Sequence, residues 1–300
     1  MLTPLDKLRS GVNDTIQIVV TTSCDLFTCS NCTQLLPFRK DYRHMSVRCF
    51  IKALESVQDW LGVVGLFGGN PCTHPRFKTL CLIMTHMIPE QRRRGLWSNN
   101  LMGHGSVVRD TFYPDGRFNL NVHGNPDAAK EMDEWVPGRV IPSSIQSAAW
   151  HSPILLNHAD FDMPHEEWVE LRENCDINQK WSAAIVERDG EPYVYFCEVA
   201  AALDGIRGEN HGLPATPGWW EAPIETYRHQ IVGCCDHGCG VPLRARGHLD
   251  NADTYDISKS FVPLLHRGRG ILNLRQHRTR PAEIVEETTD YMRLRTEKEL

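Results

Sequence analysis

The stretch Ile16-Gln-Ile-Val-Val-Thr-Thr-Ser-Cys-Asp-Leu-Phe-Thr-Cys-Ser-Asn-Cys32 decides how this chain folds. Its first five residues form an apolar, β-branched run that is typical of a buried strand. Cys24, Cys29 and Cys32 follow on the loop that leaves this strand, where three thiols can converge on one metal centre. Three thiolates without a close fourth indicate an incomplete coordination shell, which leaves a position open for a small molecule.

The cysteine spacing alone leaves three interpretations open. The first is an iron–sulfur cluster with one iron that lacks a protein ligand. The second is a zinc site, with Cys29 and Cys32 as a Cys-x2-Cys pair and His44 or Cys49 as the fourth ligand. The third is a group of buried cysteines that bind no metal.

Two further motifs follow the next two predicted strands. Gly68-Gly-Asn-Pro71, with His74 and Pro75, comes after the apolar run 63–67, and Arg94-Gly-Leu-Trp-Ser-Asn-Asn100 comes after the next helical stretch. Together with the cysteine triad, these motifs resemble the radical S-adenosylmethionine superfamily. In that family the triad follows the first strand of a partial β/α barrel, a Gly-Gly-Glu-Pro-like motif follows the second, and a Thr-Asn-Gly-like ending follows the third.

The resemblance implies a cofactor pair and the residues that hold it. Cys24, Cys29 and Cys32 would bind a [4Fe–4S] cluster, with S-adenosylmethionine chelated at the open iron. The implied cofactor-binding residues are Gly68, Gly69, Asn70, Pro71, Ser98, Asn100 and Asn121, and Asn119 and His123 lie beside Asn121 in the sequence.

The implied activity is reductive cleavage of S-adenosylmethionine and abstraction of a substrate hydrogen. The expected substrate is a peptide or a small molecule, the latter being an amino acid or a nucleotide-derived compound. The expected electron donor is a protein such as a flavodoxin or a ferredoxin.

The sequence departs from the family pattern at two places. Four residues separate Cys24 from Cys29 where the family usually has three, and Asn31 stands at a usually aromatic position. Asn70 replaces an acidic residue that commonly accepts hydrogen bonds from the amino group of S-adenosylmethionine. An amide oxygen also accepts such a bond, although without the assistance of a charge.

Alternating strand and helix patterns predict an α/β fold, a partial (β/α)6-type barrel with a C-terminal cysteine-rich extension. We expect the core in residues 1–165 and the remainder of the core with the extension in 166–300. The predicted helices are 45–61 and 77–88, and the predicted strands after the first are 63–67, 96–97, 117–122 and 152–156.

The C-terminal half contains a second group of cysteines. A predicted hairpin of 183–187 and 193–198, joined by Asp189-Gly190, lies between Cys175 and a segment with three more cysteines. We expect this region to be rich in turns and poor in regular helix. Cys175, Cys197, Cys235 and Cys239 could bind an auxiliary iron–sulfur cluster or zinc, with Cys234 as a substitute for Cys235. Cys49, Cys72 and Cys81 lie in or beside predicted helices and are expected to be packing residues.

Composition favours a cytoplasmic enzyme. The chain has 300 residues, 41% of them hydrophobic, and a net charge of −6, which gives no general attraction to nucleic acid. No segment resembles a membrane span or a secretory signal, and the 11 cysteines are expected to be reduced or bound to metal. Two alternatives remain: a zinc-binding interaction module with a decayed cofactor site, and an activating enzyme for a protein partner.

Overall fold

The computed structural model describes residues 15–26, 32–39, 42–140, 154–161, 163–173, 175, 183–243, 254–265 and 273–276. Within them, seven strands form one sheet in the order β4-β3-β2-β1-β5-β6-β7. The strands are β1 (Thr15–Thr21), β2 (Val63–Gly68), β3 (Arg94–Ser98), β4 (Arg117–Leu120), β5 (Ala183–Arg188), β6 (Glu191–Tyr195) and β7 (Leu213–Pro214).

The sheet is parallel from β4 through β1 to β5, and β6 and β7 continue it in antiparallel fashion. This arrangement confirms the predicted α/β class. The mostly parallel sheet is consistent with the predicted partial barrel. After β4 the chain crosses to the other side of β1, so that β5 pairs with β1. The second predicted region, 166–300, therefore completes the sheet that the first region begins.

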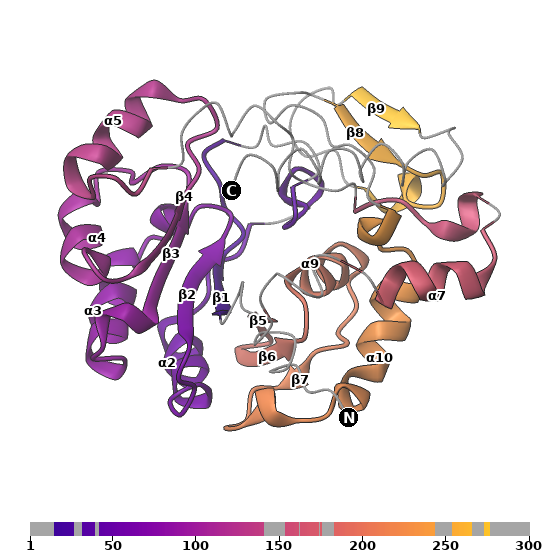
Figure 1. Ribbon diagram of the computed structural model, residues 1–300, viewed down its shortest axis with the longest axis horizontal. Helices are drawn as coiled ribbons and strands as arrows, with labels where there is room; N and C mark the ends of the chain where they lie inside the picture. Colours follow the sequence, from indigo (N-terminus) through magenta and orange to yellow (C-terminus); the bar gives the residue numbers. More distant parts are fainter. Residues whose placement is uncertain are drawn as a thin grey trace, which may run out of the picture.

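Four α-helices connect the first strands, and Figure 1 shows them along the left side of the sheet. They are α2 (Val47–Ser56), α3 (Phe77–Met87), α4 (Gly105–Phe112) and α5 (Pro126–Trp135). The predicted helices at 45–61 and 77–88 are thus confirmed, with the first one shorter than expected. Ser46 begins α2, because its side chain accepts a hydrogen bond from the backbone N–H of Cys49 at 3.1 Å.

The remaining helices lie to the right of the sheet in Figure 1. They are α7 (His165–Glu173), α9 (Glu198–Arg207) and α10 (Arg228–Gln230), which continues into a π-helical turn, Ile231–Asp236. Short 3-10 helices occur at Leu36–Phe38, Pro71–Thr73, Gln91–Arg93, His158–Phe161, Trp219–Glu221, Ile224–Tyr227, Val241–Leu243 and Val262–Leu264. Two further strands, β8 (Thr254–Ile257) and β9 (Asn273–Gln276), pair in parallel as a separate sheet.

Two expectations for the second half of the chain are wrong. Ile154–Leu156, the described part of the predicted strand 152–156, forms no strand. These residues are buried, but the carbonyl groups of Ile154 and Leu155 accept hydrogen bonds from Gly240 and Ser258 rather than from a neighbouring strand. The region around the second cysteine group is also more helical than expected, since α9 and α10 both lie within it.

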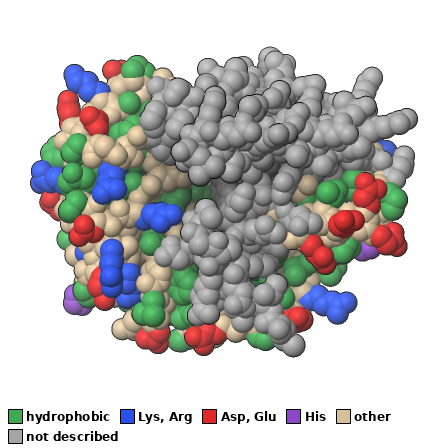
Figure 2. Space-filling view, viewed as in Figure 1, with side chains coloured by type: hydrophobic (Ala, Val, Ile, Leu, Met, Phe, Trp, Pro, Cys, Tyr) green, Lys and Arg blue, Asp and Glu red, His purple; other side chains and the backbone are tan. Residues whose placement is uncertain are grey.

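Charged side chains are interspersed over the left of the molecule in Figure 2, and acidic ones gather on the right, where α7 lies in Figure 1. The exposed acids of α7 are Glu166, Glu167, Glu170 and Glu173. On this face the described residues therefore form no basic stripe for nucleic acid. Among the described helices, none combines the length and the apolar content that crossing a bilayer requires.

The first testable prediction concerns the close approach of β1 and β2 at their ends. A Cβ atom on Gly69 would lie 2.1 Å from the carbonyl oxygen of Ser23. We expect Gly69→Ala to lower the free energy of unfolding by about 3 kcal/mol, because two backbones must separate. Gly138→Ala is the control, since nothing lies within 4 Å of its Cβ and only a left-handed backbone, at about 1 kcal/mol, opposes it. Equal losses in urea denaturation would contradict the prediction.

Candidate cofactor and metal sites

The loop that carries the first cysteines is fastened to the turn after β2. The backbone N–H of Gly69 donates to the carbonyl oxygen of Thr21 at 3.0 Å, and that of Asn70 donates to Ser23 at 2.8 Å. Gly68 has a φ of +136°, and a Cβ there would lie 2.0 Å from the carbonyl oxygen of Thr21. Glycine is therefore needed at this position for both its conformation and its size.

The side chain of Asn70 is fully buried and bonded on both sides of its amide. Its Nδ2 donates to Oδ1 of Asp25 at 2.8 Å and to the carbonyl oxygen of Asn100 at 2.9 Å. Its Oδ1 accepts from the backbone N–H of Cys72 at 3.1 Å and from Oγ of Ser98 at 2.9 Å. The amide that the sequence offered as an acceptor for a cofactor thus connects three motifs of the protein itself.

Asp25, the residue after Cys24, accepts hydrogen bonds from side-chain amides of the two other motifs. Its Oδ1 accepts from Asn70 and from Nδ2 of Asn99 at 3.1 Å, and its Oδ2 accepts from Nδ2 of Asn100 at 3.2 Å. A carboxylate accepts such bonds with charge assistance, so this residue fixes the position of the cysteine loop. The sequence analysis missed this role, although an acid beside the triad was visible.

A cavity of about 140 Å³ opens where the three motifs meet. Six of the predicted site residues line it: Cys24, Cys32, Gly68, Gly69, Ser98 and Asn121. The other lining residues are Thr33, Gln34, Leu36, Phe67, Trp97, Asn99, Asn119 and His123. Asn70, Pro71 and Asn100 stand behind this lining, and Cys29 lies outside the described residues.

The sulfur of Cys32 lies among backbone N–H groups. Burial raises the pKa of this thiol, and the N–H groups of Leu36, Gln34 and Leu35 partly offset the increase, as does the guanidinium of Arg39. Donors that point at a sulfur stabilise its thiolate form, which is the form that binds metals.

The second group of cysteines also converges. Cys175, Cys197, Cys235 and Cys239 line one small cavity whose other walls are almost entirely apolar, with Cys234 at its edge. Burial raises the pKa of Cys197 to about 12, and burial together with the neighbouring thiols of Cys235, Cys175 and Cys197 raises that of Cys239. Four thiols in an apolar pocket cannot ionise together unless a cation neutralises them.

The spacing of these thiols can be compared with the spacing of thiolates around a zinc ion. A zinc ion holds its thiolates at about 2.3 Å, so the sulfurs around it lie about 4 Å apart. Among the described residues, one group of three donor side chains has all its ligand atoms within 4.8 Å of one another, and that group contains none of these four cysteines. In the described part of the chain these four sulfurs therefore form no group of that compactness.

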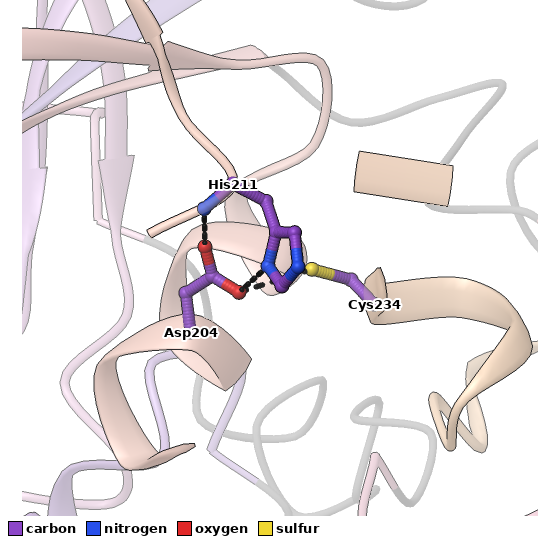
Figure 3. Close-up of side chains that lie close together, drawn as sticks. All are labelled: Asp204, His211 and Cys234. Atoms are coloured by element: carbon purple, nitrogen blue, oxygen red, sulfur yellow. Dashed lines mark hydrogen bonds and ion pairs between the residues drawn. The ribbon is translucent and has the colours of Figure 1, made fainter. Parts of the chain in front are cut away.

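That compact group is Asp204, His211 and Cys234, shown in Figure 3. Oδ1 of Asp204 is 2.8 Å from Nδ1 of His211 and accepts from Sγ of Cys234 at 3.3 Å. Oδ2 accepts from the backbone N–H of His211 at 2.6 Å and from the hydroxyl of Tyr195 at 2.7 Å. Hydrogen bonds thus satisfy the buried carboxylate without an ion. Sequence patterns did not reveal this group, because Cys234 lies on a different segment from Asp204 and His211.

No model of a protein family matches this sequence, and no curated protein matches it either. Two solved structures of BtrN are similar to this chain. The crystal structure of BtrN in complex with AdoMet and 2-DOIA has 15% sequence identity and a TM-score of 0.44, over 75% of this chain and 87% of that one. The crystal structure of selenomethionine BtrN in an open conformation has 14% identity and a TM-score of 0.38, over 74% and 86%.

A buried acid, Glu198, lies between the two cysteine groups. It follows Cys197 at the start of α9 and lies beside Thr33, the residue after Cys32. Neither carboxylate oxygen has a hydrogen-bond partner among the described residues, and burial raises the pKa of Glu198 to about 8. The side chain is therefore protonated at neutral pH in the absence of a nearby cation.

The second prediction concerns the pairing of the Asn70 amide with the Asp25 carboxylate. Asn70→Asp sets a carboxylate oxygen where Nδ2 now lies 2.8 Å from Asp25, so the two charges repel each other. We expect a loss of about 3 kcal/mol in the free energy of unfolding at pH 7. The double variant Asp25→Asn/Asn70→Asp should recover the part of that loss that comes from the two like charges, while its carboxylate still faces the carbonyl oxygen of Asn100, and urea denaturation of both variants checks this. Failure of the double variant to recover would contradict the arrangement described.

The third prediction concerns the pH dependence of Asp204. Burial alone would raise its pKa, but hydrogen bonds from His211, Tyr195 and Cys234 hold it below the ordinary value. A depressed pKa adds stability above the unfolded-state pKa, and this stability is lost as the pH falls through the folded-state value. We expect Asp204→Asn to cost about 3 kcal/mol at pH 7 and progressively less below about pH 4.

Urea denaturation of both proteins between pH 7 and pH 3 measures this difference. Tyr195→Phe is the control, because it removes one donor and keeps the charge, and its smaller cost should vary less with pH. A difference between Asp204→Asn and the wild type that stays constant over this range would contradict an ionised Asp204.

Proposed function

We propose that this protein is a radical S-adenosylmethionine enzyme that cleaves its cofactor reductively and abstracts a hydrogen from a small-molecule or peptide substrate. One observation carries the proposal. Cys24 and Cys32 line the same cavity as Gly68 and Gly69 of the second motif and Ser98 of the third. The three motifs that carry the resemblance are thus brought together at the carboxyl ends of β1, β2 and β3.

The side chains around Cys32 suit an iron–sulfur cluster. Thiolates are its usual ligands, and Cys24, Cys29 and Cys32 supply three. The backbone N–H groups that point at the Cys32 sulfur support the thiolate. These three cysteines would hold a [4Fe–4S] cluster, which would supply the electron for reductive cleavage of a carbon–sulfur bond of S-adenosylmethionine and so for abstraction of the substrate hydrogen.

The protein's own residues position the cofactor and exclude water. Gly68 and Gly69 have no side chains, so a cofactor can approach the backbone closely there. Ser98 and Asn121 offer polar groups at one wall of the cavity, and Phe67 and Trp97 offer apolar surfaces. Asn70 and Asn100 hold that wall in place through Asp25. Pro71 begins the short helix that follows the second motif.

We propose that Cys175, Cys197, Cys235 and Cys239 hold an auxiliary iron–sulfur cluster. The support for this is that the four thiols line one mainly apolar pocket, and thiolates are the usual ligands of such a cluster. Such a cluster can accept an electron, which would suit oxidation of a substrate radical. The electron that starts each cycle would come from a donor such as a flavodoxin or a ferredoxin.

The fourth prediction tests both clusters by counting iron. Wild type reconstituted without oxygen should contain about eight irons and eight sulfides per chain. Cys24→Ala/Cys29→Ala/Cys32→Ala and Cys175→Ala/Cys197→Ala/Cys235→Ala/Cys239→Ala should each contain about four. Cys49→Ala/Cys81→Ala is the control, because these buried cysteines lie on α2 and α3 outside both cavities, and it should keep all eight.

Formation of 5′-deoxyadenosine from S-adenosylmethionine with a chemical reductant completes the test. The wild type and the control should form it, and the variant without the first triad should not. About four irons in the wild type and none in the first variant would leave the C-terminal thiols without a cluster. Zinc without iron in every protein would overturn the proposal in favour of a zinc-binding interaction module.

A further inference from the structure

A second, larger cavity of about 410 Å³ lies beside the first one. It is bounded by the ends of β1 and β5, by Arg43, His44 and Met45, and by the hairpin turn after β5. Its lining residues are Val19, Thr21, Thr22, Gln34, Arg39, Arg43, His44, Met45, Val186, Glu187, Arg188, Asp189, Gly190 and Ala201.

The two cavities lie on the same face of the sheet. Val19 of the larger cavity pairs in register with Phe67 of the smaller one, and paired residues on neighbouring strands point to the same face. Ile18 pairs with Ile185, so Val19 and Val186 both point away from the face of those two residues. Gln34 lines both cavities and marks their boundary.

Three arginines line the larger cavity, and none of them forms an ion pair with a carboxylate in the described part of the chain. Of the two acids in the lining, Glu187 is already engaged, because its carboxylate accepts from the backbone N–H of Ser46 at 2.6 Å and from its Oγ at 3.0 Å. Asp189 lies exposed at the turn. The lining thus has three arginines and two acids, and the carboxylate of Glu187 bonds to Ser46 rather than to an arginine.

Arg39 connects this positive charge to the cysteine loop. Its Nε donates to the carbonyl oxygen of Gln34 at 3.1 Å, and its outer guanidinium nitrogens lie against Gly205 of α9. Burial lowers the pKa of Arg39 to about 10, and repulsion from Arg188 and Arg43 adds to the decrease. The same guanidinium lowers the pKa of the Cys32 thiol, so it lies near both the cavity and the cluster ligand.

Arg188 has unused donors. Its Nη2 lies 3.5 Å from the carbonyl oxygen of Ala201 on α9, at the limit of a hydrogen bond, and its Nε is buried without a partner among the described residues. Arg43 is exposed at the rim, where its backbone carbonyl accepts from the N–H of Thr22 at 2.9 Å. Buried guanidinium donors without partners are costly, and an anion that accepts two bonds at once would satisfy them.

We propose that this cavity binds the anionic group of the substrate, a carboxylate or a phosphate, and holds it beside the radical centre. The assignment of the anion to a substrate rests on the proposed function, but the anion site itself does not depend on it. Arginine suits this task because its planar fork matches both carboxylate and phosphate oxygens. The apolar side chains of Val19, Met45 and Val186 leave room for the carbon skeleton to continue toward Gln34 and the smaller cavity.

Calorimetric titration of the reconstituted full-length protein at low salt tests the site. The probes are inorganic phosphate and succinate, which represent the two sources of anionic groups. We expect one site per chain in the wild type, with binding at least about tenfold weaker in Arg188→Met and in Arg43→Met. Arg43 is exposed, so its variant should fold even if the loss of Arg188 disturbs the core.

Arg48→Met is the matched control. Arg48 is exposed on α2, five residues after Arg43, and lies outside the cavity lining, so the same change of charge there should leave the affinity unchanged. Tighter binding of phosphate would indicate a phosphorylated substrate, and tighter binding of succinate would indicate an acid. No saturable binding, or equal affinity in all four proteins, would overturn the anion site.

Iron content and 5′-deoxyadenosine formation, measured on the same samples, separate this result from the proposed function. Anion binding that depends on Arg43 and Arg188 in a protein without iron would leave the anion site standing and remove the radical chemistry. A protein that holds iron and cleaves S-adenosylmethionine but binds neither probe would support the radical chemistry and overturn the anion site.

Discussion

Two backbone hydrogen bonds at the ends of β1 and β2 hold the candidate active site together. The N–H groups of Gly69 and Asn70 donate to the carbonyl oxygens of Thr21 and Ser23, and the absence of side chains at Gly68 and Gly69 permits this approach. The loop with Cys24 is thereby fixed against the turn after β2. The shape of the smaller cavity and its position beside the larger one both follow from that contact.

The sequence predicted the first half of the fold well, because its strands are short apolar runs and its helices have regular apolar spacing. It failed at the predicted strand 152–156, whose described residues, 154–156, are apolar and buried but have no strand to pair with. Strand pairing is a property of the neighbours of a segment. Periodicity within the segment therefore cannot reveal whether a partner strand exists.

Residue types predicted the members of the site better than their roles. Cys24, Cys32, Gly68 and Gly69 of the motifs lie around one cavity, and the four C-terminal cysteines share another. The amide of Asn70, in contrast, bonds to the protein itself. Its Nδ2 donates to Asp25 and to Asn100, which lie on separate loops. The arginine cavity also went unnoticed, since Arg39, Arg43 and Arg188 meet only through the pairing of β1 with β5.

The π-helical turn Ile231–Asp236 gives two adjacent cysteines different neighbours. Cys234 hydrogen-bonds to Asp204, and Cys235 lies with the other thiols of the C-terminal pocket. Deleting one residue from this turn would rotate everything after it by about 100° around the helix axis. The length of this turn should therefore be maintained as strictly as its cysteines, because the number of residues itself assigns each sulfur to its partner.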